Sequence, residues 1–156
     1  RSFGLSYQEA AIALLESRED YIKLRNFAIG MAIATVSTLG IVSLTPIADL
    51  WLITVAGLSD SLAQFSRLPL ILYTIFPATT VAISFQRALL VATKNTNPVS
   101  LASILEVTGI TTVMLGLIYY ADFIGVSAAI IAYTVGRTIA MLYLSKSSKQ
   151  AANKYL

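Results

Sequence analysis

The sequence contains no cysteine and no histidine, and only 12% of its residues are charged. Without cysteine and histidine, the chain offers no disulfide, no thiolate chemistry, no common zinc site and no imidazole base. It also contains no phosphate-binding loop and no nucleophile paired with a base. We therefore expect no enzymatic activity, no cofactor and no bound metal. Soluble domains carry about 25% charged residues, about twice the share found here, so a soluble fold could not cover its surface.

What the chain does contain is long apolar runs. Hydrophobic residues make up 56% of its 156 residues, and the mean hydropathy is +0.75. About 20 consecutive apolar residues suffice to cross the hydrocarbon core of a bilayer. The runs predict an all-α polytopic membrane protein with a four-helix transmembrane domain over residues 26–145. Its spans are expected at about residues 26–48, 68–92, 98–121 and 123–145.

Prolines and the single tryptophan refine these boundaries. Pro46 is expected to end or kink span one, Pro69 to lie in the first turn of span two, and Pro77 to kink that span in the middle. Residues 50–59 are too few to cross and include Trp51. They predict an interfacial helix or an extension of span one, because tryptophan favours the membrane–water interface.

Residues 1–25 are expected to form a cytoplasmic connector. An amphipathic helix over residues 6–25 is predicted, with a capping box formed by Ser6 and Glu9, lying along the membrane surface. A second Ser-x-x-acid pattern, Ser17 to Asp20, indicates a break before the first span. Residues 146–156 are polar and basic and are expected to form a cytoplasmic tail.

The positive charges predict the orientation of the spans. Lysine and arginine residues precede span one, flank the turn between spans two and three, and follow span four, whereas the opposite side holds mainly aspartates around Arg67. Cytoplasmic loops carry the excess of positive charge in membrane proteins. We expect a multi-pass protein of the inner or plasma membrane with both termini in the cytoplasm and a tight outer turn at Asp122.

Three charged residues fall inside the predicted spans: Arg87, Glu106 and Arg137. Glu106 and Arg137 are almost equally far from the turn near Asp122, and Arg87 and Glu106 are almost equally far from the turn near Thr96. At 1.5 Å per residue, all three should lie at one level, roughly 12–15 Å from the cytoplasmic ends of spans three and four.

Charges inside a span are expensive, so each needs a partner or a function. In a structural interpretation, Glu106 neutralises one or both arginines and fixes the register of the helices. In a functional interpretation, the three residues carry one net positive charge next to a water-filled cavity and bind a phosphate or carboxylate of a substrate, because paired arginines suit such groups. Both interpretations remain open at this point.

Two segments resemble the MOP superfamily, which includes polysaccharide flippases, lipid-linked precursor flippases and multidrug and toxic-compound extrusion (MATE) transporters. Residues 87–98, RALLVATKNTNP, are similar to the family's "R-x-L-x-A … T-x-P" turn. Residues 124–129, IGVSAA, are similar to the "G-V-x-G-A-A" start of its closing helix. The chain departs from the family at Lys94 or Asn95, where glycine is usual, and at Glu106 and Thr108, where asparagine is usual.

The resemblance implies a MATE-like transporter of two six-helix lobes, of which this chain would supply the last four spans. The transporter would export a lipid-linked glycan or another anionic amphiphile by alternating access. Expected partners are membrane lipids, the substrate, and either an N-terminal lobe of the same protein or a second copy, with no nucleic acid. Because the sequence departs from the family pattern at these positions, an ion-coupled exporter of small anions or drugs, as in the related progressive ankylosis family, is a second alternative. A non-transporting, self-associating membrane scaffold is the third alternative.

Overall fold

A computed structural model describes residues 2–121 and 125–155, and within these ranges every regular element is a helix. Four helical stretches are long and apolar enough to cross a membrane, which confirms the predicted all-α polytopic fold. The elements in chain order are α1 (Ser2–Leu14), α2 (Arg18–Leu44), α3 (Ile47–Asp49), a π-helical segment (Leu50–Val55), α4 (Asp60–Tyr73), α5 (Phe76–Ala92), α6 (Asn97–Ala121) and α7 (Val126–Ala152).

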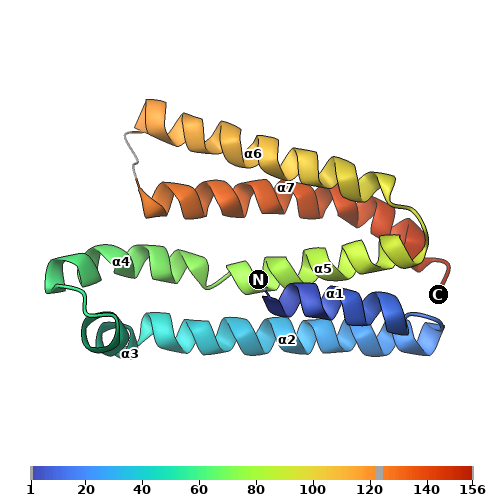
Figure 1. The fold of residues 1–156 in the computed structure, drawn as a ribbon, viewed down its shortest axis with the longest axis horizontal. Helices are drawn as coiled ribbons and strands as arrows, with labels where there is room; N and C mark the ends of the chain where they lie inside the picture. Colours follow the sequence, from blue (N-terminus) through green and yellow to red (C-terminus); the bar gives the residue numbers. More distant parts are fainter. Residues whose placement is uncertain (1, 122–124, 156) are drawn as a thin grey trace.

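The long helices lie side by side in the order α6, α7, α4–α5, α2 (Figure 1). Helix α6 packs almost entirely on α7, and α7 packs in turn on α5 and α4. The helices therefore form a row rather than a closed bundle. Many large apolar side chains consequently stay exposed along α2 and α6, as lipid-facing or partner-facing surfaces require.

The amino-terminal segment differs from its prediction. In place of one helix over residues 6–25, α1 ends at Leu14 and α2 begins at Arg18. The helix already includes Ser6 as an internal residue, so the predicted capping box of Ser6 and Glu9 is wrong. The capping box is formed instead by Ser17 and Asp20, whose side chains each accept from the other's backbone N–H. The break predicted from that second pattern is confirmed.

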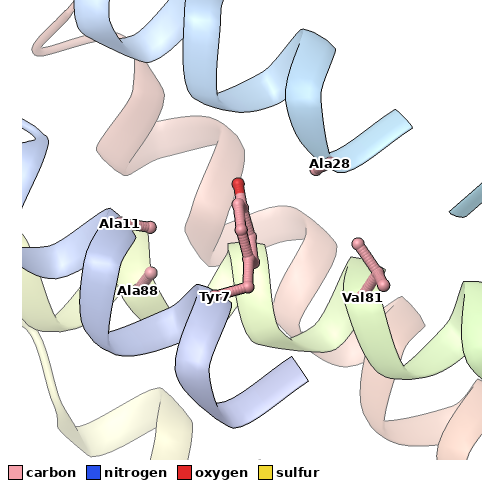
Figure 2. Packing of buried hydrophobic residues seen from close by; sticks show 5 residues of the cluster. All are labelled: Tyr7, Ala11, Ala28, Val81 and Ala88. Carbon is pink, nitrogen blue, oxygen red and sulfur yellow. The ribbon is translucent and has the colours of Figure 1, made fainter. Parts of the chain in front are cut away.

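Helix α1 runs alongside α2 and α5 instead of across their ends (Figure 1). Tyr7 and Ala11 on α1 are buried against α2 and α5 (Figure 2). The Tyr7 hydroxyl donates to the Leu24 carbonyl oxygen at 2.9 Å. Gly4 allows a close approach, because a Cβ there would lie 2.7 Å from the Thr80 methyl carbon. The prediction of a surface-lying connector is therefore wrong, because the side chains on one face of α1 are packed between two spans.

Span one ends before Pro46, where the chain turns into α3 and the π-helical segment. Figure 1 shows α3 nearly end-on while the spans run lengthwise, so this piece crosses the bundle axis as an interfacial helix would. Trp51 is exposed on it. The structure favours the interfacial alternative over an extension of span one.

Span two is longer than predicted and is broken in the middle. Helix α4 already begins at Asp60, so Pro69 lies inside the helix and its predicted place in the first turn is wrong. Pro77 stands in the first turn of α5, directly after the break at residues 74 and 75. Because Pro77 lacks an N–H and its ring crowds the preceding turn, the helix is interrupted there, as predicted. Ser43 on α2 bonds the Thr74 hydroxyl at 2.9 Å and holds the break in place.

Residues 146–152 of the predicted basic tail continue the last helix beyond the end expected for span four. Helix α7 continues to Ala152, and Ala152 and Tyr155 are buried in a cluster with Leu15, Tyr21 and Leu89. Apolar residues in the segment drive this packing, since the Tyr155 ring stacks on that of Tyr21. The cluster joins the α1–α2 link and the ends of α5 and α7 at one end of the row. The turn predicted at Asp122 lies outside the described residues.

Candidate functional site

The structure brings the three charged residues of the predicted spans together. Arg87 comes from α5, Glu106 from α6 and Arg137 from α7. They lie at one level, as the distances from the turns predict. Glu106 and Arg137 are only 7% and 4% exposed. At that burial an unpaired charge would be strongly destabilising, so the pairing of these groups decides the energetics of the site.

Glu106 holds both arginines, one on each carboxylate oxygen. Its Oε1 accepts from Arg137 Nε at 3.0 Å, and its Oε2 accepts from Arg87 Nη2 at 3.1 Å. Arg87 Nη2 also donates to Ser103 Oγ at 3.3 Å. Two cations on one carboxylate leave a net charge of about +1 on the cluster. We refer to Arg87, Glu106 and Arg137 together as the charged cluster.

Arg137 is further held by three side chains. Its Nη1 donates to the Thr80 hydroxyl, and its guanidinium carbon lies 4.8 Å from the centre of the Phe76 ring and 5.4 Å from that of Tyr133. Aromatic faces stabilise cations by their negative quadrupole. Because Phe76 is the first residue of α5, the break in span two places an aromatic ring against this guanidinium.

A cavity of about 240 Å³ lies against the two arginines, between α1, α5 and α7. Its walls are formed by Leu5, Gln8, Thr80, Ile83, Ser84, Arg87 and Arg137. Glu106 does not line it, because the carboxylate lies behind the guanidinium groups on the α6 side. The cavity therefore faces the cationic side of the charged cluster together with neutral polar groups, which is an arrangement suited to an anion.

One donor of the cluster has no partner within the described part of the chain. Arg87 Nε is buried and makes no hydrogen bond, and Gln86 Oε1 on the same turn is likewise buried without a partner. A buried donor without a partner costs about 1–3 kcal/mol, and such groups occur where a water or ligand completes the site. The unsatisfied nitrogen belongs to an arginine that lines the cavity.

Sequence reasoning found the charged cluster but missed the residues that hold it. These residues stand at helical spacing from the charged ones. Thr80 precedes Arg87 by two turns, while Ser103 precedes Glu106 and Tyr133 precedes Arg137 by one turn each. Searching one or two turns along each charged face would have found all three. Phe76 follows in the same way, one turn before Thr80.

The fold and the site define a helical membrane protein with four candidate spans and a buried arginine–glutamate–arginine cluster facing a cavity. Comparisons with protein-family models, curated proteins and solved structures found no match to this chain.

Proposed function

We propose that the chain is the C-terminal portion of a MOP-type transporter that exports an anionic amphiphile, such as a lipid-linked glycan, by alternating access. The cavity beside Arg87 and Arg137 is the observation that carries the proposal. A purely structural cluster would be expected to be packed on all sides. Here two guanidinium groups border an open volume, and the Glu106 carboxylate that contacts both of them lies outside its lining. This favours transport over a scaffold.

The arrangement of helices supports a partner lobe. The row of helices leaves α2 and α6 with large exposed apolar faces. In a two-lobed carrier, part of such a face would contact the opposing lobe, and substrate would move between the lobes as they rock. We place the transporter in the inner or plasma membrane, with the end formed by the α1–α2 link, the α5–α6 turn and the end of α7 in the cytoplasm. The lysines and arginines of those segments support this orientation.

Replacing Arg87 with Gln tests the transport role most cleanly. A charge exchange between Glu106 and Arg137 would be a less clear test. Because Glu106 also contacts Arg87, the exchange would put an arginine at position 106 directly beside Arg87. Arg87→Gln instead keeps the more buried Glu106–Arg137 pair and removes the net charge of the cluster, together with the Arg87 contacts to Glu106 and Ser103. We expect the variant to fold and to move a fluorescent short-chain phosphatidic acid analogue at least tenfold more slowly, in vesicles reconstituted with the protein purified from its native membrane.

Arg67→Gln is the matched control for this experiment. Arg67 on α4 is 43% exposed and pairs with Asp49 on α3 at 3.4 Å. Helices α3 and α4 lie at the end of the row away from the α5–α6 turn (Figure 1). Its loss should leave the rate near that of the unmodified protein. Equal rates for the Arg87 variant and the unmodified protein would contradict a role in transport and return the cluster to a structural one.

The intact mass of the protein in its native membrane tests the two-lobed organisation. We expect a mass two to three times the 16.8 kDa of this chain. A mass equal to that of the chain would exclude a second lobe in the same polypeptide. It would leave a homodimeric carrier or a self-associating scaffold, which cross-linking in the membrane would distinguish.

A further inference from the structure

An apolar groove lies next to the cavity of the charged cluster. Its volume is about 420 Å³, and it runs between α2, the break in span two and the start of α1. Ala34 and Leu39 line it from α2, and Tyr73, Phe76 and Val81 line it from α4 and α5. Volumes of about 300–1,000 Å³ are typical of small-molecule sites.

The groove presents almost no free polar group, although threonines line it. Thr35 donates its hydroxyl hydrogen to the Met31 carbonyl oxygen at 2.8 Å, and Thr38 donates to that of Ala34 at 2.8 Å. Because these hydroxyls bond their own helix, the threonines offer mainly methyl groups to the groove. The groove is thus chemically matched to a hydrocarbon.

Thr80 lines both the groove and the cavity, and Gly4 in the groove is followed in sequence by Leu5 in the cavity. The Thr80 hydroxyl accepts from Arg137, while its methyl carbon faces Gly4 on α1. A cationic pocket and a hydrocarbon groove therefore meet at one side chain.

We propose that the two volumes form one binding site for an anionic amphiphile, with its anionic head in the cavity and its tail in the groove. A phosphate or carboxylate would bind the guanidinium groups of Arg87 and Arg137 in the cavity, and one hydrocarbon tail would lie in the groove. The cavity volume of about 240 Å³ is large enough to admit a phosphate ester. This assignment rests on the anion site of the proposed function and adds to it the location of the tail.

The binding of dodecyl phosphate tests the assignment. Radiolabelled dodecyl phosphate is measured by scintillation proximity on the protein purified from its native membrane in a steroid-based detergent, which has no linear tail to occupy the groove. We expect inorganic phosphate and dodecanol each to compete at least tenfold more weakly than unlabelled dodecyl phosphate. Equal competition by dodecanol would show that the groove takes any lipid tail and would overturn the assignment, and so would equal competition by inorganic phosphate.

Variants then separate the tail from the head. Ala34→Trp, at an exposed position lining the groove, should weaken dodecyl phosphate at least tenfold and leave inorganic phosphate unchanged, and Thr38→Trp one turn further provides a second groove variant. Ile33→Trp is the matched control, since Ile33 is 61% exposed and does not line the groove. Full dodecyl phosphate affinity in the folded groove variants would overturn the location of the tail while leaving the anion site intact.

The same binding assay also tests the anion site of the proposed function, through the Arg87→Gln variant. Arg87→Gln should weaken both dodecyl phosphate and inorganic phosphate at least tenfold. Unchanged binding of both ligands would contradict the anion site and, with it, the assignment of the tail to the groove. Binding that follows the predicted pattern in a protein that moves no lipid would contradict export and support the amphiphile site.

Discussion

Replacing Glu106 with Gln is expected to lower the thermal midpoint of unfolding by about 10 °C. The change removes the carboxylate that Arg87 and Arg137 share and leaves the buried Arg137 and the partly buried Arg87 without an anion. Breaking a buried ion pair by removing one partner costs about 3–5 kcal/mol, and in a chain of this length each kcal/mol shifts the midpoint by about 2–4 °C. Thermal unfolding of the purified protein in detergent measures the effect.

An added anion should partly reverse the loss. If the cavity admits anions, phosphate should raise the midpoint of the Glu106→Gln protein more than that of the unmodified protein, because a ligand stabilises the state that binds it. Glu9→Gln serves as the control, since Glu9 is exposed on α1 and its replacement should change the stability by less than about 0.5 kcal/mol. A Glu106→Gln midpoint equal to that of the control would mean that the arginines do not depend on Glu106.

Replacing Gly136 with Ala is expected to destabilise the α6–α7 hairpin and to disturb the charged cluster with it. A Cβ at Gly136 would lie 2.5 Å from Ile110 Cγ1, 2.8 Å from the Glu106 carbonyl oxygen and 2.9 Å from the Ile110 backbone nitrogen. Two of these atoms belong to the backbone, so α6 and α7 must move apart. Overpacking of this kind costs about 1–3 kcal/mol, measured as a fall in the unfolding midpoint.

Gly116→Ala is the matched control for the hairpin, because Gly116 lies in α6, the other helix of the hairpin, and a Cβ there would meet no atom within 4 Å. It should leave the stability unchanged or raise it slightly, since alanine favours a helix by up to about 1 kcal/mol over glycine. Ile110→Ala should not rescue the Gly136 variant, because it removes only the side-chain contact. Rescue by Ile110→Ala would show that the helices do not approach as closely as described.

The position of the charged cluster along the helices could be predicted because it depends only on the helical rise per residue. Helices rise by a constant amount per residue, so counting residues from the turns is enough to place Arg87, Glu106 and Arg137 at one level. The sequence could not tell whether Glu106 would hold one arginine or both. That depends on how the three helices rotate about their axes, which the packing of Gly109 against Gly136 sets across the α6–α7 hairpin.

The place of α1 could not be predicted, for a different reason. An amphipathic helix buries its apolar face equally well at a membrane surface or between two spans. Gly4, Tyr7 and Ala11 decide the outcome, because they combine a close approach to α5 with a hydrogen bond to the backbone of α2. Their spacing of three and four residues was a signal for helix packing. The cavity itself was also beyond sequence reasoning, since it exists only because α1 lies over α5 and contributes Leu5 and Gln8 to the wall.

A water-accessible, positively charged cavity is central to the proposed function, and thiol labelling tests for this cavity directly. The chain has no cysteine, so Gln8→Cys introduces a single thiol in the cavity wall and Ala10→Cys a single exposed control on the same helix. We predict that the thiol at position 8 reacts at least fivefold faster with an anionic methanethiosulfonate than with a cationic one, relative to the control. Adding Arg87→Gln should remove most of this preference. A thiol at position 8 that reacts with neither reagent, or that shows no preference for the anion, would contradict the account.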